Sequence, residues 1–248
     1  MRTVDLNCDM GEGCLNDAEL MEFVTSVNIA CGSHAGDAET MRATVELAKA
    51  KNIAIGSHPS FPDRVNFGRS IMSLQPSEIY TAVRQQTLTL MNVCEDARTV
   101  LDHVKPHGAL YNLSARDRAT AAAIAASVRD VDASLILFGL AGSLSISEAE
   151  RAGLRTASEA FADRTYQPDG SLTPRDHDDA LITGAADAAA QALSIVWDRR
   201  AFATDGAKVA IMADTICIHG DGPNAVDLAR TIHDTLLSHN INISRLNG

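Results

Sequence analysis

Short apolar runs alternate along this chain with longer segments in which apolar residues recur every three or four positions. The short runs end in glycine or polar residues, as strands do, and the longer segments have the period of amphipathic helices. In the segment 38–51, for example, Met41, Val45 and Ala48 form one apolar stripe. The expected strands are Val4–Cys8, Val27–Ala30, Ile53–Ile55, Val100–Val104, Leu135–Leu140, Arg155–Phe161 and Thr215–Ile218. The expected helices are Asp17–Phe23, Ala38–Lys51, Ser77–Ala97, Ala115–Arg129, Ser143–Ala152, Asp176–Arg200 and Asn224–His239.

A strand followed by a helix, repeated about seven times, predicts a parallel sheet covered by helices. The length of 248 residues suits one α/β domain over residues 1–248, because barrels of this class reach that size and no glycine-rich linker divides the chain. We therefore expect an irregular (β/α) barrel of about seven strands, TIM-barrel-like, with an open doubly wound sheet as the alternative. Near the end, Lys208–Met212 and Thr215–His219 are expected to form a hairpin or one bulged strand.

Composition narrows the class of protein further. Hydrophobic residues make up 46% of the chain and aromatics only 4%, which favours a core of Ala, Val, Ile and Leu. A formal net charge of −11 argues against a nucleic-acid partner, because no basic surface is available to neutralise phosphates. The five cysteines form no Cys-x-x-Cys pair, and no apolar stretch is long enough to span a membrane. We expect a soluble cytoplasmic protein with reduced thiols.

Polar clusters directly follow most of the expected strands. Because the carboxyl ends of parallel strands meet at one edge of a sheet or barrel, these clusters are expected to form one rim. A rim of His, Asp, Asn, Lys and Gly is typical of an active site. The clusters lie at residues 7–12, 28–37, 56–59, 105–108, 159–164 and 219–221.

The first cluster begins on a strand whose side chains alternate between two faces. Asp5, Asn7 and Asp9 share one face and are expected to point inward together. Glu12 follows on a glycine turn, where a ligand can approach the backbone closely. We expect a functional role for Asp9, and the alternative for this cluster is that Asp5 is a salt-bridged core residue and Glu12 is solvated.

Histidines mark the next two clusters. His34 lies on a loop of small residues and His58 ends the third strand, and an imidazole suits either proton transfer or metal binding. Asn28 and Asp37 lie at the two ends of the second cluster. Asp37 is either a ligand-binding residue or the N-cap of the following helix, since Asp is a favoured cap.

The fourth cluster places His103, Lys105 and His107 on alternate positions and so on one face. A buried lysine needs an anion, which here is either a substrate group or an ion-pair partner such as Asp5 or Asp9. His103 lies deeper in the strand and is expected to be a hydrogen-bonded core residue.

The last cluster contains a Gly-x-Gly-x-x-Ala string at 220–225, between His219 and a helix. Too little chain follows for a dinucleotide-binding unit, so an anion site at the helix N-terminus is the better interpretation. Asp221 could instead cap that helix and would then oppose an anion. The chain contains no Walker string, so a nucleotide would have to be bound in another way.

These clusters resemble the sequence motifs of the LamB/YcsF family, in the right order and over nearly the whole chain. The resemblance implies an irregular (β/α) barrel related to the glycoside hydrolase and deacetylase barrels. It also implies ATP-dependent hydrolysis of the lactam of 5-oxo-L-proline to L-glutamate, by a 5-oxoprolinase in which this chain is joined by two partner subunits, the B- and C-subunits. The motifs are residues 6–12 (LNCDMGE), 28–37 (NIACGSHAGD), 58–63 (HPSFPD), 67–69 (FGR), 104–112 (VKPHGALYN), 161–164 (FADR) and 217–221 (CIHGD).

Within that reaction we expect Asp9 or His34 to act as a base, and Lys105 or Arg69 to stabilise anionic groups. The expected cofactor is ATP with Mg²⁺, which accompanies phosphate transfer. Candidate acids or orienting groups are His58, His107 and His219. Candidate residues for binding substrate or phosphate are Asn7, Glu12, Asn28, Asp37, Arg69, His219 and Asp221.

Asp9, His34 and His58 come from adjacent strand ends and could also bind a divalent metal ion, with a metal-free hydrogen-bonded network as the alternative. Two other functions stay open. One is a metal-dependent amidase or deacetylase that needs no ATP. The other is a protein without catalytic activity that presents a ligand to its partners.

Overall fold

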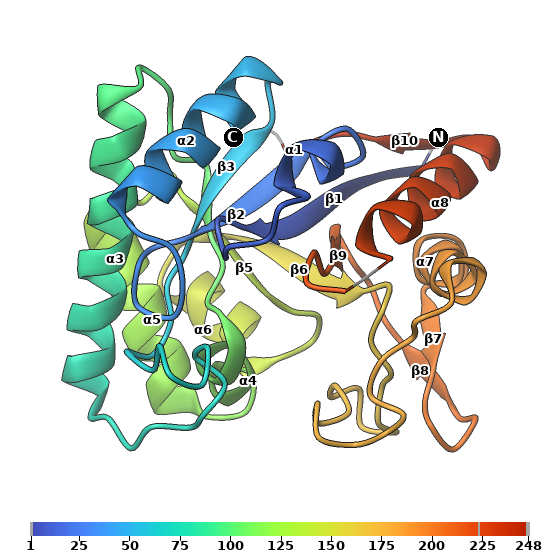
Figure 1. Ribbon diagram of the computed structural model, residues 1–248. Helices are drawn as coiled ribbons and strands as arrows, with labels where there is room; N and C mark the ends of the chain where they lie inside the picture. Colours follow the sequence, from blue (N-terminus) through green and yellow to red (C-terminus); the bar gives the residue numbers. More distant parts are fainter. Residues whose placement is uncertain (1, 223, 247–248) are drawn as a thin grey trace.

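In the computed structural model, which describes residues 2–222 and 224–246, seven parallel strands close into a barrel (Figure 1). The strands follow chain order from β1 to β6, and β9 completes the barrel by pairing with both β6 and β1. The expected barrel is thus confirmed, and the open sheet is wrong. The barrel strands are β1 (Arg2–Met10), β2 (Ser26–Ala30), β3 (Ala54–His58), β4 (His103–Val104), β5 (Ile136–Leu140), β6 (Arg155–Phe161) and β9 (Thr215–Ile218).

The alternation of side chains on β1 explains how the barrel is filled. Leu6, Cys8 and Met10 face outward into the main apolar cluster between the strands and the helices. Asp5 and Asn7 face inward and are completely buried. The inside of this barrel is therefore polar at β1, and its polar groups must be satisfied by neighbouring strands.

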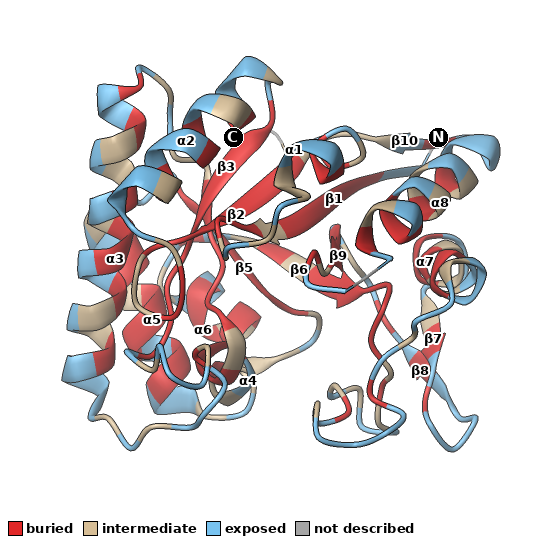
Figure 2. Cartoon of the chain, viewed as in Figure 1, coloured by how far each residue is buried: buried red, intermediate tan, exposed pale blue. Residues whose placement is uncertain are grey.

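Helices surround the strands, with buried inner faces and exposed outer faces (Figure 2). Two begin at aspartates that cap their first turn: the carboxylates of Asp37 and Asp117 accept the backbone N–H groups of Thr40 and Thr120 at 2.8 and 2.7 Å. The helices are α1 (Asp17–Leu20), α2 (Ala38–Ala50), α3 (Pro76–Asp96), α4 (Gly108–Ser114), α5 (Arg118–Val131), α6 (Leu144–Arg151), α7 (Ala185–Asp198) and α8 (Ala225–Ser238).

The chain between β6 and β9 differs most from the prediction. The helix expected at Asp176–Arg200 begins only at Ala185, because residues 162–184 form a long loop that Arg164 holds through the carbonyls of Thr173 and Ala180. Neither form expected for Lys208–Met212 and Thr215–His219 is correct. Instead β8 (Lys208–Ala210) pairs antiparallel with β7 (Arg200–Phe202), outside the barrel.

Smaller differences concern short elements. The helix expected at Ala115–Arg129 is two helices, α4 and α5, and a short strand that was not expected, β10 (Ile241–Ile243), pairs with the start of β1. The five cysteines, all within the described residues, carry free thiols. Among residues 2–222 and 224–246, no helix is both long and apolar enough to cross a membrane.

Candidate active site

A cavity of about 1030 Å³ opens at the carboxyl ends of the barrel strands. Acidic and basic side chains at the ends of four different strands form its floor. Arginines from the loops after β3 and β6 form its walls. The predicted rim is therefore a real concave site. Lining residues with chemistry are Asp9, Glu12, His58, Arg69, Lys105, His107, Tyr111, Arg164, Arg175, His219 and Asp221.

Beneath the floor, two asparagines connect the strands. Asn28 donates through Nδ2 to Asn7 Oδ1 at 2.8 Å and to Asp9 Oδ1 at 2.9 Å. His103 donates from Nε2 to Asn28 Oδ1 at 2.9 Å, and burial lowers its pKa to about 3. The expectation of a hydrogen-bonded core histidine is confirmed. Asn7 and Asn28 thus position Asp9 and do not line the cavity.

Asp5 closes the bottom of this network without a cation. Its carboxylate accepts hydroxyl hydrogen bonds from Thr25, Ser26 and Thr215 at 2.5–2.7 Å. Burial nevertheless raises its pKa, because three hydroxyl groups do not replace full hydration. The expected salt bridge of Asp5 is replaced by hydrogen bonds.

Lys105 provides the positive charge of the barrel interior. Its Nζ lies 2.9 Å from Asp9 Oδ1, 2.9 Å from Glu159 Oε1 and 3.1 Å from Cys217 Sγ. Burial alone would lower the Lys105 pKa, but Asp9, Cys217 and Glu159 outweigh burial and raise it well above its usual value. Burial alone would also raise the Asp9 pKa, yet His58 and Lys105 hold it well below the usual range. Asp9 is therefore an ionised carboxylate at neutral pH.

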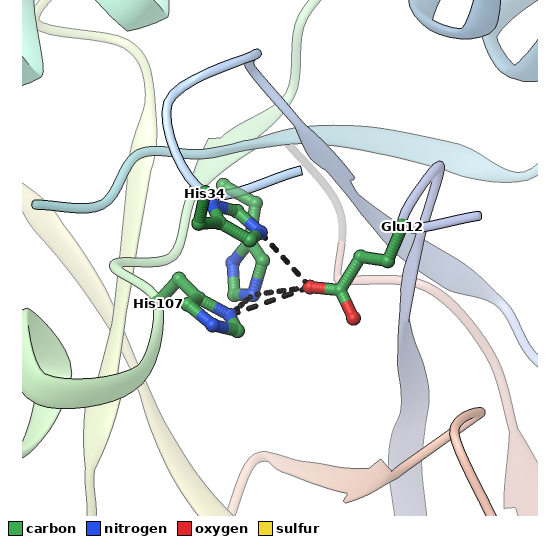
Figure 3. A group of neighbouring side chains, drawn as sticks. Glu12, His34 and His107 are labelled. Carbon is green, nitrogen blue, oxygen red and sulfur yellow. Dashed lines mark hydrogen bonds and ion pairs between the residues drawn. The ribbon is translucent and has the colours of Figure 1, made fainter. Parts of the chain in front are cut away.

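Three histidines gather around Glu12 at the rim (Figure 3). Glu12 Oε1 lies 3.0 Å from His34 Nε2, 3.3 Å from His107 Nδ1 and 3.9 Å from His58 Nε2. The rings of His34 and His107 stack with centroids 3.8 Å apart. Burial lowers the pKa of His34 and, together with the neighbouring histidines, lowers that of His107 further, so both rings are neutral at neutral pH.

The loop after β3 locks this cluster in place. The Phe67 carbonyl accepts a hydrogen bond from His107 Nε2 at 2.9 Å, and Phe67 adopts a left-handed backbone with φ of 56°. At Gly68, an added Cβ would lie 2.9 Å from the His107 ring and 3.0 Å from His34. Such strain and close packing suit a loop whose position matters for the site.

The wall of the cavity carries a second group of charges. Asp221 accepts hydrogen bonds from Arg69 at 2.8 Å and from Arg175 at 3.3 Å. Next to it, His219 donates from Nδ1 to Asp163 at 2.9 Å. Burial would raise the pKa of Asp163, but His219 outweighs it and lowers that pKa. Two guanidinium groups thus share one carboxylate and face the cavity together.

The structure brings most predicted residues together, although Asn7, Asn28 and His34 lie behind the residues that line the cavity. Asp37 caps α2 through Thr40 and is not among the described residues that line the cavity, so its N-cap interpretation is correct. Asp9 lies 3.2 Å from His58 Nε2, and the possible metal ligands converge in two groups, one of Glu12, His34, His58 and His107 and one of Asp9, Cys217 and His219. The string at 220–225 includes Pro223, which lies outside the described residues.

Several residues of the site were not singled out from the sequence. Glu159 and Asp163 lie in one of the predicted polar clusters, yet acidic residues are too common there to stand out. Tyr111 and Arg175 come from a helix and a loop, and only the folded chain brings them to the cavity. The sequence offered one signal for Glu159. A buried Lys105 needs anionic partners, and Glu159 is one of them.

Comparisons with known proteins agree with this architecture. The model of the LamB/YcsF family matches residues 4–248. The chain is 50% identical to the 5-oxoprolinase A-subunit of Geobacillus kaustophilus over 98% of this chain and 96% of that protein. It is 51% identical to the 5-oxoprolinase A-subunit of Bordetella parapertussis over 97% of each.

A solved structure provides an independent comparison. The crystal structure of the lactam utilization protein from Thermus thermophilus superposes with a TM-score of 0.92 and 42% sequence identity, covering 98% of this chain and all of that one. Fold, length and sequence agree over the whole described barrel. The chain therefore belongs to the LamB/YcsF family.

Proposed function

We propose that this chain hydrolyses the lactam bond of 5-oxo-L-proline to give L-glutamate, in an ATP-dependent reaction, as the A-subunit of a 5-oxoprolinase that also contains B- and C-subunits. The names of its relatives support the substrate class. The observation that carries the proposal is the cavity itself, with an ionised carboxylate on its floor, a neutral imidazole at its rim and guanidinium groups on its wall.

The wall suits the α-carboxylate of the substrate. Arg69 and Arg175 face the cavity and share Asp221 as their only common anion among the described residues. A guanidinium can bind a carboxylate through two parallel hydrogen bonds. This contact would turn the lactam ring toward the floor.

The reaction needs activation because a five-membered lactam is resonance-stabilised and recloses intramolecularly. The lactam oxygen attacks the γ-phosphorus of Mg²⁺-bound ATP, and ADP leaves. Water then adds to the activated carbon as a base takes its proton. The ring nitrogen leaves once an acid protonates it, which breaks the C–N bond and gives an acyl phosphate. Hydrolysis of that phosphate releases glutamate and inorganic phosphate.

The floor offers groups for each proton transfer. Asp9 is ionised and can accept the proton of the attacking water. His219 donates an Nδ1–H hydrogen bond to Asp163, so once its Nε2 is also protonated, that Nε2–H is the group that delivers a proton to the leaving amine. The Nζ of Lys105 donates to acceptors of the protein itself. Its role is therefore to position Asp9 and keep it ionised, and not to contact the substrate.

Tyr111 supplies a further donor. Burial and Glu159 raise its pKa well above the usual value, so the phenol stays protonated. Its hydroxyl is buried close to the Glu159 carboxylate but forms no well-oriented hydrogen bond with any described residue. A buried donor without a partner costs about 1–3 kcal/mol, and a bound substrate oxygen would satisfy it.

The experiment is an assay of ADP and glutamate formation by this chain, with and without its two partner subunits. We expect 5-oxoproline-dependent formation of both products in the full complex, and loss of glutamate formation in Asp9→Asn. The matched control is Asp37→Asn, because Asp37 caps α2 outside the cavity. Equal turnover of wild type and Asp9→Asn would overturn the role of Asp9. Hydrolysis of a simple amide by the isolated chain without ATP would support the amidase alternative.

A further inference from the structure

Four side chains at the rim turn their acceptor atoms toward one small volume (Figure 3). One oxygen of Glu12 and one nitrogen each of His34, His58 and His107 all lie within 4.8 Å of one another. These residues follow or end β1, β2, β3 and β4 in turn, so the barrel itself sets their spacing. The hydrogen bonds on the far side of each ring indicate where the protons of these histidines lie.

The hydrogen bonds behind the rings fix where the protons of two histidines lie. His58 Nδ1 lies 2.7 Å from the carbonyl oxygen of Lys105, and His107 Nε2 lies 2.9 Å from that of Phe67. A carbonyl can only accept, so each of these nitrogens carries the ring proton. The opposite nitrogens, His58 Nε2 and His107 Nδ1, then face each other at 2.9 Å, and His58 Nε2 also lies 3.2 Å from Asp9 Oδ2.

His34 is oriented in the same way. Its Nδ1 lies 2.9 Å from Ser60 Oγ, whose own proton goes to the Phe61 carbonyl at 2.9 Å. Gln86 on α3 clamps Ser60 through both the N–H and the carbonyl of its backbone. Ser60 therefore accepts from Nδ1, and the Nε2 lone pair of His34 faces Glu12 at 3.0 Å.

Four potential ligand atoms that converge in this way, with the opposite ring nitrogens already hydrogen-bonded, are stabilised by a cation between them. A single shared proton could join His58 and His107, but it would leave the lone pair of His34 against Glu12. We propose that Glu12, His34, His58 and His107 together bind one divalent transition-metal ion of the Zn²⁺ class. Metal-bound histidines characteristically donate their other N–H to a carbonyl, carboxylate or water, and two of these three donate to carbonyls and the third to a hydroxyl.

The spacing of the acceptor atoms fits this ion. Metal–ligand bonds of about 2.0–2.1 Å at tetrahedral angles separate the ligand atoms by about 3.3–3.4 Å. The separations from Glu12 Oε1 are 3.0, 3.3 and 3.9 Å, and the pair His58–His107 is at 2.9 Å. Glu12, His58 and His107 also line the cavity, which gives the ion a path of entry.

A neighbouring group of possible ligands is already neutralised. Asp9, Cys217 and His219 also converge within 4.8 Å. However, the Nζ of Lys105 lies 2.9 Å from Asp9 Oδ1 and 3.1 Å from Cys217 Sγ, so a positive charge already satisfies that group. This difference selects the histidine cluster as the metal site.

The test measures metal binding without substrate, so its outcome is independent of the proposed lactam reaction. The full chain is stripped with a chelator, dialysed and titrated with Zn²⁺ by calorimetry and with Co²⁺ by visible absorption. We expect one equivalent of each metal and the intense visible bands of four-coordinate Co²⁺. His34→Gln and His107→Gln should each weaken binding by at least 100-fold, and Ser60→Ala by about 10- to 100-fold.

His219→Gln is the matched control, because it removes a histidine of the same rim from the other group. It should bind Zn²⁺ as wild type does. Circular dichroism and thermal unfolding establish that each variant is folded, and Ser60→Ala keeps the ligands should a histidine variant fail to fold. Absence of stoichiometric binding to the folded wild type would overturn the proposal. So would binding that survives His34→Gln and His107→Gln but is lost in His219→Gln.

Discussion

Lys105 and Asp9 form a buried ion pair at the floor of the cavity, with Nζ 2.9 Å from Oδ1. The same Nζ lies 2.9 Å from Glu159 Oε1, so one cation is shared by two carboxylates that come from different strands of the barrel. Lys105 therefore contacts both carboxylates, and His58 adds to its effect at Asp9. Together they keep Asp9 ionised, which the proposed proton transfer requires.

Lys105→Met is expected to destabilise the fold strongly, because it removes the cation that two buried carboxylates share. Breaking a buried pair in this way costs about 3–5 kcal/mol. The measurement is the free energy of unfolding in urea. Lys51→Met, which removes the partner of Glu22 at the surface, is the control and should cost less than about 1 kcal/mol. A similar small cost for Lys105→Met would contradict the central role of this ion pair.

Tyr111→Phe separates stability from function. The variant removes a buried hydroxyl that forms no well-oriented hydrogen bond with any described residue, so the free energy of unfolding should stay within about 1 kcal/mol of wild type or rise. Under the proposed reaction, kcat/KM for 5-oxoproline should fall by about 10-fold, because the donor to substrate is lost. Unchanged kinetics together with unchanged stability would show that the hydroxyl has no part in substrate binding.

Arg175→Gln tests the wall of the cavity. Loss of a charge-assisted hydrogen bond to the substrate carboxylate should raise KM for 5-oxoproline by about 10- to 100-fold, with a smaller effect on kcat. Steady-state kinetics of the full complex give both values. Arg118→Gln is the matched control, since Arg118 pairs with Glu148 and does not line the cavity. An equal KM for the two variants would remove Arg175 from the binding site.

Stability should fall as the pH falls from about 7 to 5. The pKa of His103 is lowered to about 3 in the folded chain, against about 6.5 when unfolded, so below pH 6.5 the unfolded chain binds a proton that the folded chain does not. His103→Gln should reduce the slope of unfolding free energy against pH by about 1 kcal/mol per pH unit between pH 5 and 6. Phe138→Leu, which alters the ring stacked on His103, should keep the wild-type slope. A slope unaffected by His103→Gln would contradict a neutral buried imidazole.

Gly56→Ala should be severely destabilising although the substitution is small. An added Cβ would lie 2.1 Å from His103 Nε2, so the ring would have to leave its hydrogen bond to Asn28. Overpacking of this kind costs about 1–3 kcal/mol or more. Gly222→Ala, where no heavy atom lies within 4 Å of the added Cβ, should change stability by less than about 0.5 kcal/mol. Adding His103→Ala to Gly56→Ala should recover part of the loss, and no recovery would exclude this clash as the cause.

Much of the site was predictable from local sequence. The alternation of Asp5, Asn7 and Asp9 on β1 required only the two-residue period of a strand, and the rim position of His34 and His58 required only that parallel strands end at the same edge. The membership in the LamB/YcsF family, expected from the motifs, is confirmed. The assignment of Asp37 failed as a site prediction because a local hydrogen bond to Thr40 satisfies its carboxylate.

The sequence by itself determined which residues alternate, which cap helices and which end strands, because these properties depend on neighbours a few positions apart. Only the tertiary structure decided that Lys105 pairs with both Asp9 and Glu159, and that the rings of His34 and His107 stack. Those contacts join residues far apart in the chain. Their distances depend on the order and register in which β1, β2, β4 and β6 close around the barrel, which no local pattern encodes.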